Sequence, residues 1–208
     1  MSRRWEALAP WAGIAFVALF LVGFLLAGDP GTKDGAKIAR HFAQERTRIL
    51  IGMYLGGLAL LALFVWVWSL RGSLLRAGEE ALSTAVLVAG VLAIAVEFPV
   101  IALNTGLAFI SDQRVDPGLA RALYDVALVF SYVDWFPVAL LFAALALALR
   151  RSRLVASWLA WTAAAIGVLG LVAAPPALGL DLPVSVISFL WIVAFTVTLG
   201  VSPIERRQ

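Results

Sequence analysis

Two acidic side chains inside otherwise apolar segments are the residues of this sequence that could do chemistry. Glu97 lies midway along one apolar run and Asp134 lies deep in the next, and no lysine or arginine falls within the apolar cores to neutralise them. A charge at the centre of a bilayer costs on the order of 2.5–3.5 kcal/mol. We therefore expect Glu97 to be protonated, hydrogen-bonded or beside a water-filled cavity.

The positions of the two acids predict that they face each other. A short connection joins their two runs, which predicts antiparallel neighbouring helices, and Glu97 and Asp134 then lie at similar depths. Two carboxyl groups that share a proton titrate as a coupled pair, an arrangement suited to acid catalysis or proton relay. If the protein is an enzyme, these two acids are its candidate catalytic residues.

Polar residues near this pair have both functional and structural interpretations. Asn104 returns to almost the same helical face as Glu97, where it could contact a ligand or form a hydrogen bond between helices. Asp125 lies nine residues before Asp134, which is two and a half helical turns, so the two aspartates lie on opposite faces of the helix. Asp125 therefore points away from the pair. For Asp125 we favour an ion pair with Arg46 or Arg48 at the outer end of the second apolar run.

Trp135 differs from the other tryptophans because it is expected to be buried beside an acid. The rings of Phe98, Tyr132 and Phe136 are expected nearby, and an aromatic pocket with an acid suits an apolar ligand or a carbocation. Ordinary aromatic packing is the simpler explanation and the one we favour. The candidate ligand-binding residues are Asn104, Asp125, Tyr132, Trp135 and Arg46.

The residues that are missing exclude several kinds of chemistry. The chain has no cysteine and one histidine, His41, which excludes disulfides, thiolate metal sites and histidine-based metal or haem centres within one chain. It also lacks a nucleotide-binding loop, a Gly-x-Ser-x-Gly elbow and a His-Glu-x-x-His helix. We expect neither a metal nor a cofactor.

The composition is that of a polytopic membrane protein. Of 208 residues, 62% are hydrophobic and 14% are charged, whereas soluble domains have roughly 25% charged residues. The net charge of +3 is carried by short basic clusters between apolar runs, which is the pattern of topology signals. We expect the lipid bilayer, and a small apolar ligand, as partners and no nucleic acid; the sequence specifies no protein partner.

Six apolar runs are long enough to cross a bilayer as helices, which predicts an all-α bundle of six transmembrane helices in one domain. The third and fourth runs exceed the ~20 residues needed, so we expect tilting or kinks at Pro99 and Pro137. Tryptophans near the ends of the runs, Trp66 among them, are expected to anchor at the interface. The runs span about 10–28, 48–70, 82–110, 120–149, 154–174 and 184–201.

The distribution of basic residues places both termini in the cytoplasm. The run 10–28 follows a pair of arginines as in a secretory signal, but it is too long and lacks a small-x-small cleavage site. We therefore expect it to be retained as the first span. The excess of arginine over lysine, with abundant alanine, leucine and valine, is typical of GC-rich bacteria, so the expected location is a bacterial plasma membrane.

The first loop, 29–47, predicts a short amphipathic helix on the outer surface. Asp34 can cap its N-terminus. One face carries the apolar residues Ile38, Ala39, Phe42 and Ala43. The helix could be a lid over the bundle, but we favour an ordinary interfacial helix that leads into the second span.

Short motifs spread over most of the chain resemble those of a known group. They are an Ile-Ala-x-x-Phe surface helix at 38–42, Glu-Arg-Thr-Arg-Ile-Leu-Ile-Gly at 45–52, Ala-Leu-Tyr-Asp at 122–125, Phe-Pro at 136–137 and Trp-Leu-Ala-Trp at 158–161. The chain is similar to actinobacterial six-span integral membrane proteins of unknown function, which implies the six-helix fold but no particular activity. Arg46, Gly52, Asp125 and Pro137 match that group, whereas Glu97 and Asp134 depart from it.

Three functions fit these residues. We favour a non-enzymatic membrane protein whose polar, aromatic pocket between the second, third and fourth spans binds a small or lipid-like ligand or supports a partner complex. The second is a membrane-embedded cyclase or isomerase that protonates an isoprenoid-like substrate. The third is proton-linked transport through the same acids.

Overall fold

The computed structural model describes residues 11–111, 115–152, 155–174 and 181–201, in which all the regular secondary structure is helical. The prediction of an all-α chain is confirmed. The helices are α2 (Ala12–Ala27), α3 (Gly35–Gln44), α4 (Arg46–Arg76), α5 (Glu80–Ile110), α6 (Pro117–Val133), α7 (Trp135–Ser152), α8 (Ser157–Ala173) and α9 (Asp181–Val201).

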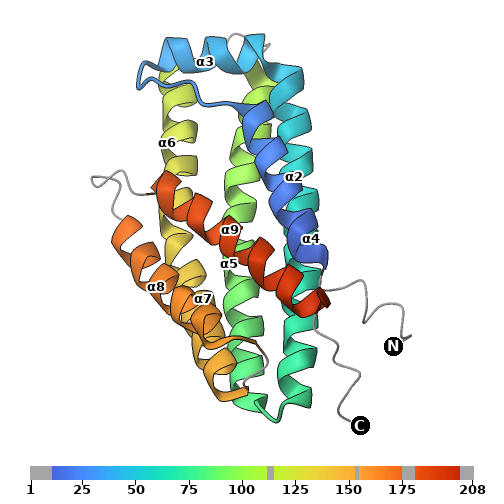
Figure 1. Cartoon of the computed structure of the whole chain (residues 1–208). Coiled ribbons are helices and arrows are strands. Elements are labelled where there is room, and N and C mark those ends of the chain that lie inside the picture. The colour runs from blue at the N-terminus through green and yellow to red at the C-terminus, as the bar shows by residue number, and fades with distance from the viewer. Residues whose placement is uncertain (1–10, 112–114, 153–154, 175–180, 202–208) are drawn as a thin grey trace.

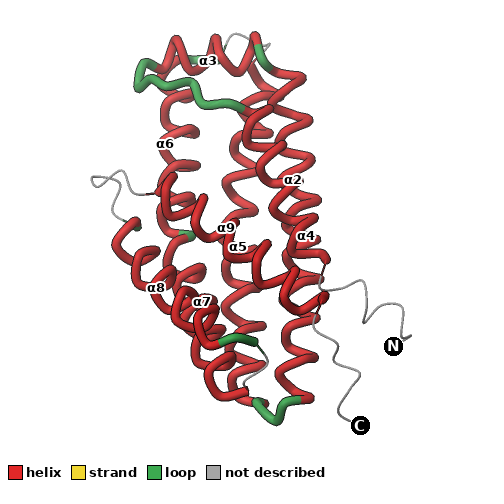
Figure 2. Tube along the Cα trace, viewed as in Figure 1, coloured by secondary structure: helices red, strands yellow, loops and turns green. Residues whose placement is uncertain are grey.

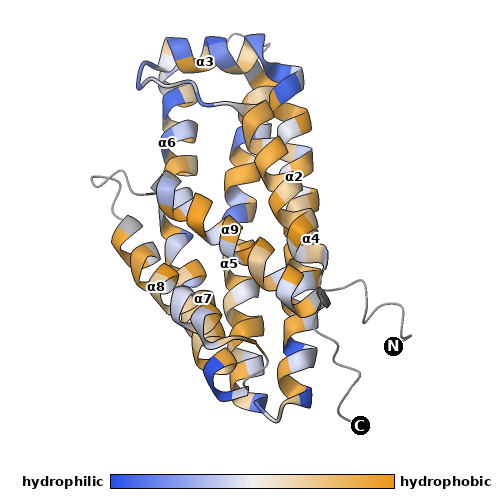
Figure 3. Ribbon diagram, viewed as in Figure 1, coloured by the Kyte–Doolittle hydropathy of each residue, from blue (hydrophilic) through white to orange (hydrophobic). Residues whose placement is uncertain are grey.

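Helices make up most of the molecule (Figures 1 and 2). Three segments of the described chain are long and apolar enough to cross a membrane, namely α4, α5 and the run Pro117–Ser152 formed by α6 and α7; the shorter helices α2, α8 and α9 are apolar as well. Polar residues gather on α3 and at the opposite end of the bundle (Figure 3). These are the properties of a membrane-embedded protein, and six crossings stay a prediction.

Glycines set the closest helix contacts. A Cβ atom on Gly23 of α2 would lie 2.7 Å from the carbonyl oxygen of Gly52 on α4, so only glycine permits this approach. Farther along, Gly56 of α4 faces Ile101 of α5, and Gly90 of α5 faces Val67 of α4. The last two contacts fix the antiparallel register of α4 and α5.

The aromatic core lies between α4, α7 and α9. Trp66 is fully buried and meets the ring of Phe195 edge-on, with ring centroids 6.1 Å apart. The ring of Trp191 stacks on that of Phe195, with centroids 4.9 Å apart. The prediction that Trp66 anchors at the interface is therefore wrong. Exposed tryptophans, as expected of interface anchors, are Trp11, Trp68, Trp158 and Trp161.

The predicted fourth span is interrupted. The helix α6 ends at Val133, α7 begins at Trp135, and Asp134 forms the break between them. Pro137 causes the interruption because it has no N–H to donate to the carbonyl group of Val133. The sequence predicted one helix kinked at Pro137, and the structure places the break three residues earlier. Pro99, by contrast, lies inside a continuous α5.

The helix α3 lies across one end of the bundle (Figure 1). As predicted, Asp34 caps it, because its carboxylate accepts hydrogen bonds from two backbone N–H groups of the first turn. Ile38 and Phe42 are buried, whereas Ala43 is exposed, so the predicted apolar face is shorter than expected. The two buried side chains join a cluster made of Ile49, Leu107, Ala108 and Ala120. These contacts make α3 a cap on the bundle.

Candidate functional site

Glu97 lies at the middle of the apolar length of the bundle. The register of α4 and α5 places it level with Leu60, which is midway between Arg48 and Arg71, the arginines that bound the apolar part of α4. Its side chain is partly buried. Within the described ranges, Glu97 forms no hydrogen bond and no ion pair. No basic group of the described residues therefore compensates this acid.

Asp134 is the acid whose charge acts on Glu97. Burial has the largest effect on the electrostatics of Glu97, and the charge of Asp134 comes second; α5 packs against both α6 and α7. One oxygen of Asp134, Oδ1, is buried and has no hydrogen-bond partner in the part of the chain that the structure describes. A buried carboxyl oxygen without a partner is costly. A proton held by the pair, or a donor group that enters the site, is the species that satisfies it.

Prolines lie close in the sequence to both acids. Pro99 lies two residues after Glu97, and Pro137 lies three residues after Asp134. Because proline has no N–H, each leaves the carbonyl oxygen four residues before it without its usual helical donor. Both acids therefore lie in stretches of helix that lack one backbone hydrogen bond.

Asn104 is bound to its own helix. Its Nδ2 donates a hydrogen bond of 2.8 Å to the carbonyl oxygen of Val100, one turn earlier on α5. The predicted hydrogen bond between helices is therefore not formed. The side chain is partly buried, and this bond uses one of the two N–H donors of its amide group.

Asp125 also finds its partner on its own helix. It is exposed and lies 3.4 Å from Arg121, four residues earlier on α6. Arg48 pairs with Glu45 at 2.8 Å, and Arg46 lies over an aromatic ring of α5, 5.8 Å from its centroid. The favoured pairing of Asp125 with the second span is wrong, because a partner one turn away was closer.

The predicted aromatic pocket is not assembled around the acids. Trp135 is buried, but its ring packs against α8 at Gly170. Phe98 and Phe136 are 48% and 56% exposed, and Tyr132 is only partly buried. Successive helical residues point about 100° apart, so aromatic neighbours in the sequence need not share the direction of an acid. Trp135 therefore makes ordinary packing contacts, which is the interpretation that we favoured over an aromatic pocket.

Two contacts that the sequence did not predict join distant segments. Tyr124 on α6 donates a hydrogen bond of 2.8 Å to Asp29 in the loop before α3. Arg150 on α7 lies over the ring of Trp161 on α8, 4.6 Å from the centroid. Neither pair has a spacing signal, because the partners lie on different elements.

No protein-family model, curated protein or solved structure matches this chain. The resemblance to actinobacterial six-span proteins stays a prediction, and the geometry of the acid pair carries the functional proposal.

Proposed function

We propose that this chain is a multi-pass protein of a bacterial plasma membrane with six crossings and both termini in the cytoplasm, like the actinobacterial group that it resembles. The three long and three shorter apolar helices support the crossings. Basic residues support the sidedness: Arg71 and Arg76 on α4 and Arg150 and Arg151 on α7 lie at the same end of the bundle, where the two helices meet through Leu74 and Leu149.

We infer that Glu97 and Asp134 together bind an exchangeable proton in the middle of the membrane and that the protein carries out proton-linked transport. One observation carries this inference: the buried Oδ1 atom of Asp134 has no hydrogen-bond partner in the described chain, and the charge of the same aspartate acts on Glu97. Two ionised carboxylates without a basic partner are costly in a membrane. A proton shared by the pair removes one of the charges and supplies the missing donor.

The position of Asp134 supports transport over a static structural role. In many transporters the coupling-ion site lies near the bilayer midplane, where a membrane helix is broken. Asp134 is the residue at which α6 gives way to α7, and Glu97 is level with the middle of the apolar part of α4. A change of angle at this break changes the distance between the two acids, which couples protonation to helix movement.

The two other functions lose support from the positions of the rings. Ligand binding in an aromatic pocket and cation stabilisation by an acid-catalysing enzyme both need aromatic faces around the acids. Phe98 and Phe136 are largely exposed, and Trp135 packs against α8.

Proton flux in vesicles tests the proposal. The purified chain is reconstituted with a pH-sensitive dye inside, and a potassium diffusion potential drives protons inward. Wild-type vesicles should acidify faster than empty ones, and Glu97→Gln or Asp134→Asn should reduce the rate to that of empty vesicles. Asp125→Asn is the matched control, because this aspartate is exposed and bound to its own helix. Equal rates for wild-type and empty vesicles would refute proton movement through the acid pair in the absence of a coupled solute.

A further inference from the structure

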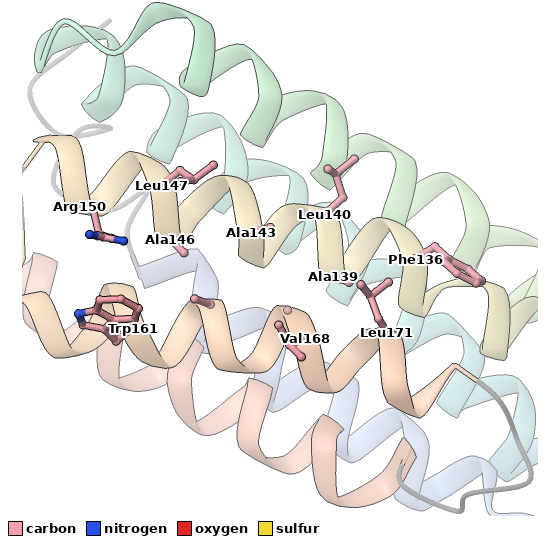
Figure 4. Close-up of a pocket in the computed structure, with 12 residues that line it drawn as sticks. Phe136, Ala139, Leu140, Ala143, Ala146, Leu147, Arg150, Trp161, Val168 and Leu171 are labelled. Carbon is pink, nitrogen blue, oxygen red and sulfur yellow. The ribbon is translucent and has the colours of Figure 1, made fainter.

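An open apolar groove runs between α7 and α8, with a volume of about 480 Å³ (Figure 4). Small residues form its floor, among them Ala143, Ala146 and Gly167, and larger side chains such as Leu140 and Leu171 form its walls. The floor exists because α7 and α8 approach closely. A Cβ atom on Gly167 would lie only 3.1 Å from a backbone oxygen of α7.

One end of the groove carries positive charge. Arg150 lies there, with its guanidinium group over the exposed ring of Trp161 (Figure 4). Arg151 is the next residue and is exposed. Neither arginine forms an ion pair with another residue in the described ranges. The rest of the groove has no charged side chain along its lining.

The length of the groove is sufficient for a hydrocarbon chain. From Phe136 to Arg150 it follows 14 residues of α7, or about 21 Å at 1.5 Å per residue. This exceeds the ~15 Å of one leaflet of the hydrocarbon core.

We propose that this groove is a binding site for an anionic phospholipid, with one acyl chain between α7 and α8 and the phosphate group beside Arg150. Apolar walls match the chain, the unpaired guanidinium groups match the negative headgroup, and basic sites at the cytoplasmic ends of helices favour such lipids. The site is separate from the acid pair. Phe136 lines the groove, and two helical residues turn the direction of a side chain by about 200° from that of Asp134.

Native mass spectrometry of the full chain in detergent tests the proposal. The dissociation constant of the first bound lipid is measured for phosphatidylglycerol and for phosphatidylcholine with the same acyl chains. Wild type should bind phosphatidylglycerol more tightly, and Arg150→Gln should weaken that binding about fivefold with little effect on phosphatidylcholine. Arg76→Gln, an exposed arginine at the same end of the bundle, is the matched control and should change neither.

A variant that fills the groove tests the acyl-chain part of the proposal. Ala143→Phe should weaken the binding of both lipids, whereas Ala18→Phe, at an equally exposed alanine on α2, should not. Equal affinities of wild type for the two lipids, or equal effects of Arg150→Gln and Arg76→Gln, would overturn the proposal. Loss of a dimer in Ala143→Phe with unchanged lipid binding would also overturn it, because a second copy would then be the occupant.

Discussion

Replacing Gly90 by alanine should weaken the contact between α4 and α5, and a second substitution at Val67 should recover most of the loss. A Cβ atom on Gly90 would lie 2.7 and 2.8 Å from the two Cγ atoms of Val67 and 3.2 Å from its Cβ. Val67 is fully buried and β-branched, so its side chain cannot rotate away. The clash must therefore separate the two helices.

The expected size follows from these contacts. Overpacking of a core costs typically about 1–3 kcal/mol, and alanine regains ~1 kcal/mol over glycine in helix propensity, so Gly90→Ala should lower the free energy of unfolding by about 1 kcal/mol. Val67→Ala removes two methyl groups and should cost about 1–2 kcal/mol. In the double variant the new methyl group occupies the vacated space. The free energy of unfolding of the double variant should be about 1–2 kcal/mol higher than the value expected if the two single losses were additive.

Unfolding of the purified protein in mixed micelles, followed by circular dichroism, measures all three variants. Gly106→Ala is the matched control, because a Cβ atom on this glycine of α5 meets no atom within 4 Å; it should be neutral or stabilising. Additive effects, or a Gly90→Ala variant as stable as Gly106→Ala, would refute the register of α4 and α5. Glu97 would then no longer be placed level with Leu60.

Three further substitutions test the cap formed by α3 and the loop that precedes it. Asp34→Ala removes the N-cap and should cost about 1 kcal/mol, seen as faster amide hydrogen exchange across α3; unchanged exchange would contradict the capping role. Tyr124→Phe removes the hydrogen bond to Asp29 and should cost about 1 kcal/mol, seen as faster proteolysis of the loop before α3. Asp29→Asn tests the same bond at its acceptor. If Tyr124→Phe resists protease as well as wild type does, the bond does not hold the loop.

Local patterns in the sequence predicted the helices well. Continuous apolar runs determine where helices form, and the aspartate at position 34, followed by an amphipathic stretch, predicted α3 and its cap, which the structure confirms. The position of the break between α6 and α7 was harder to predict. Proline at 137 predicted an interruption, but the residue at which it falls depends on which carbonyl group loses its donor and on the packing of the next helix.

Contacts between side chains were predictable only in part. The acids at 97 and 134 were expected to face each other at similar depth, and this stays a prediction, although the charge of Asp134 acts on Glu97. The partner of Asp125 was not predicted correctly, because it depends on helix rotation. A rotation of about 100° separates neighbouring residues, so a small error in the packed face moves a ring from the site to the opposite side.

Infrared difference spectroscopy tests the central claim, that Glu97 and Asp134 hold an exchangeable proton between them. Protonated and ionised carboxyl groups absorb at different frequencies, so a buried protonated acid stands out from ionised acids on the surface. At neutral pH, wild type in lipid should show a protonated carboxyl band that shifts on transfer to heavy water, changes frequency in Glu97→Gln and in Asp134→Asn, and disappears when both acids are replaced, while Asp125→Asn retains it. A wild-type spectrum without this band, or a band that survives in the double variant, would contradict the account.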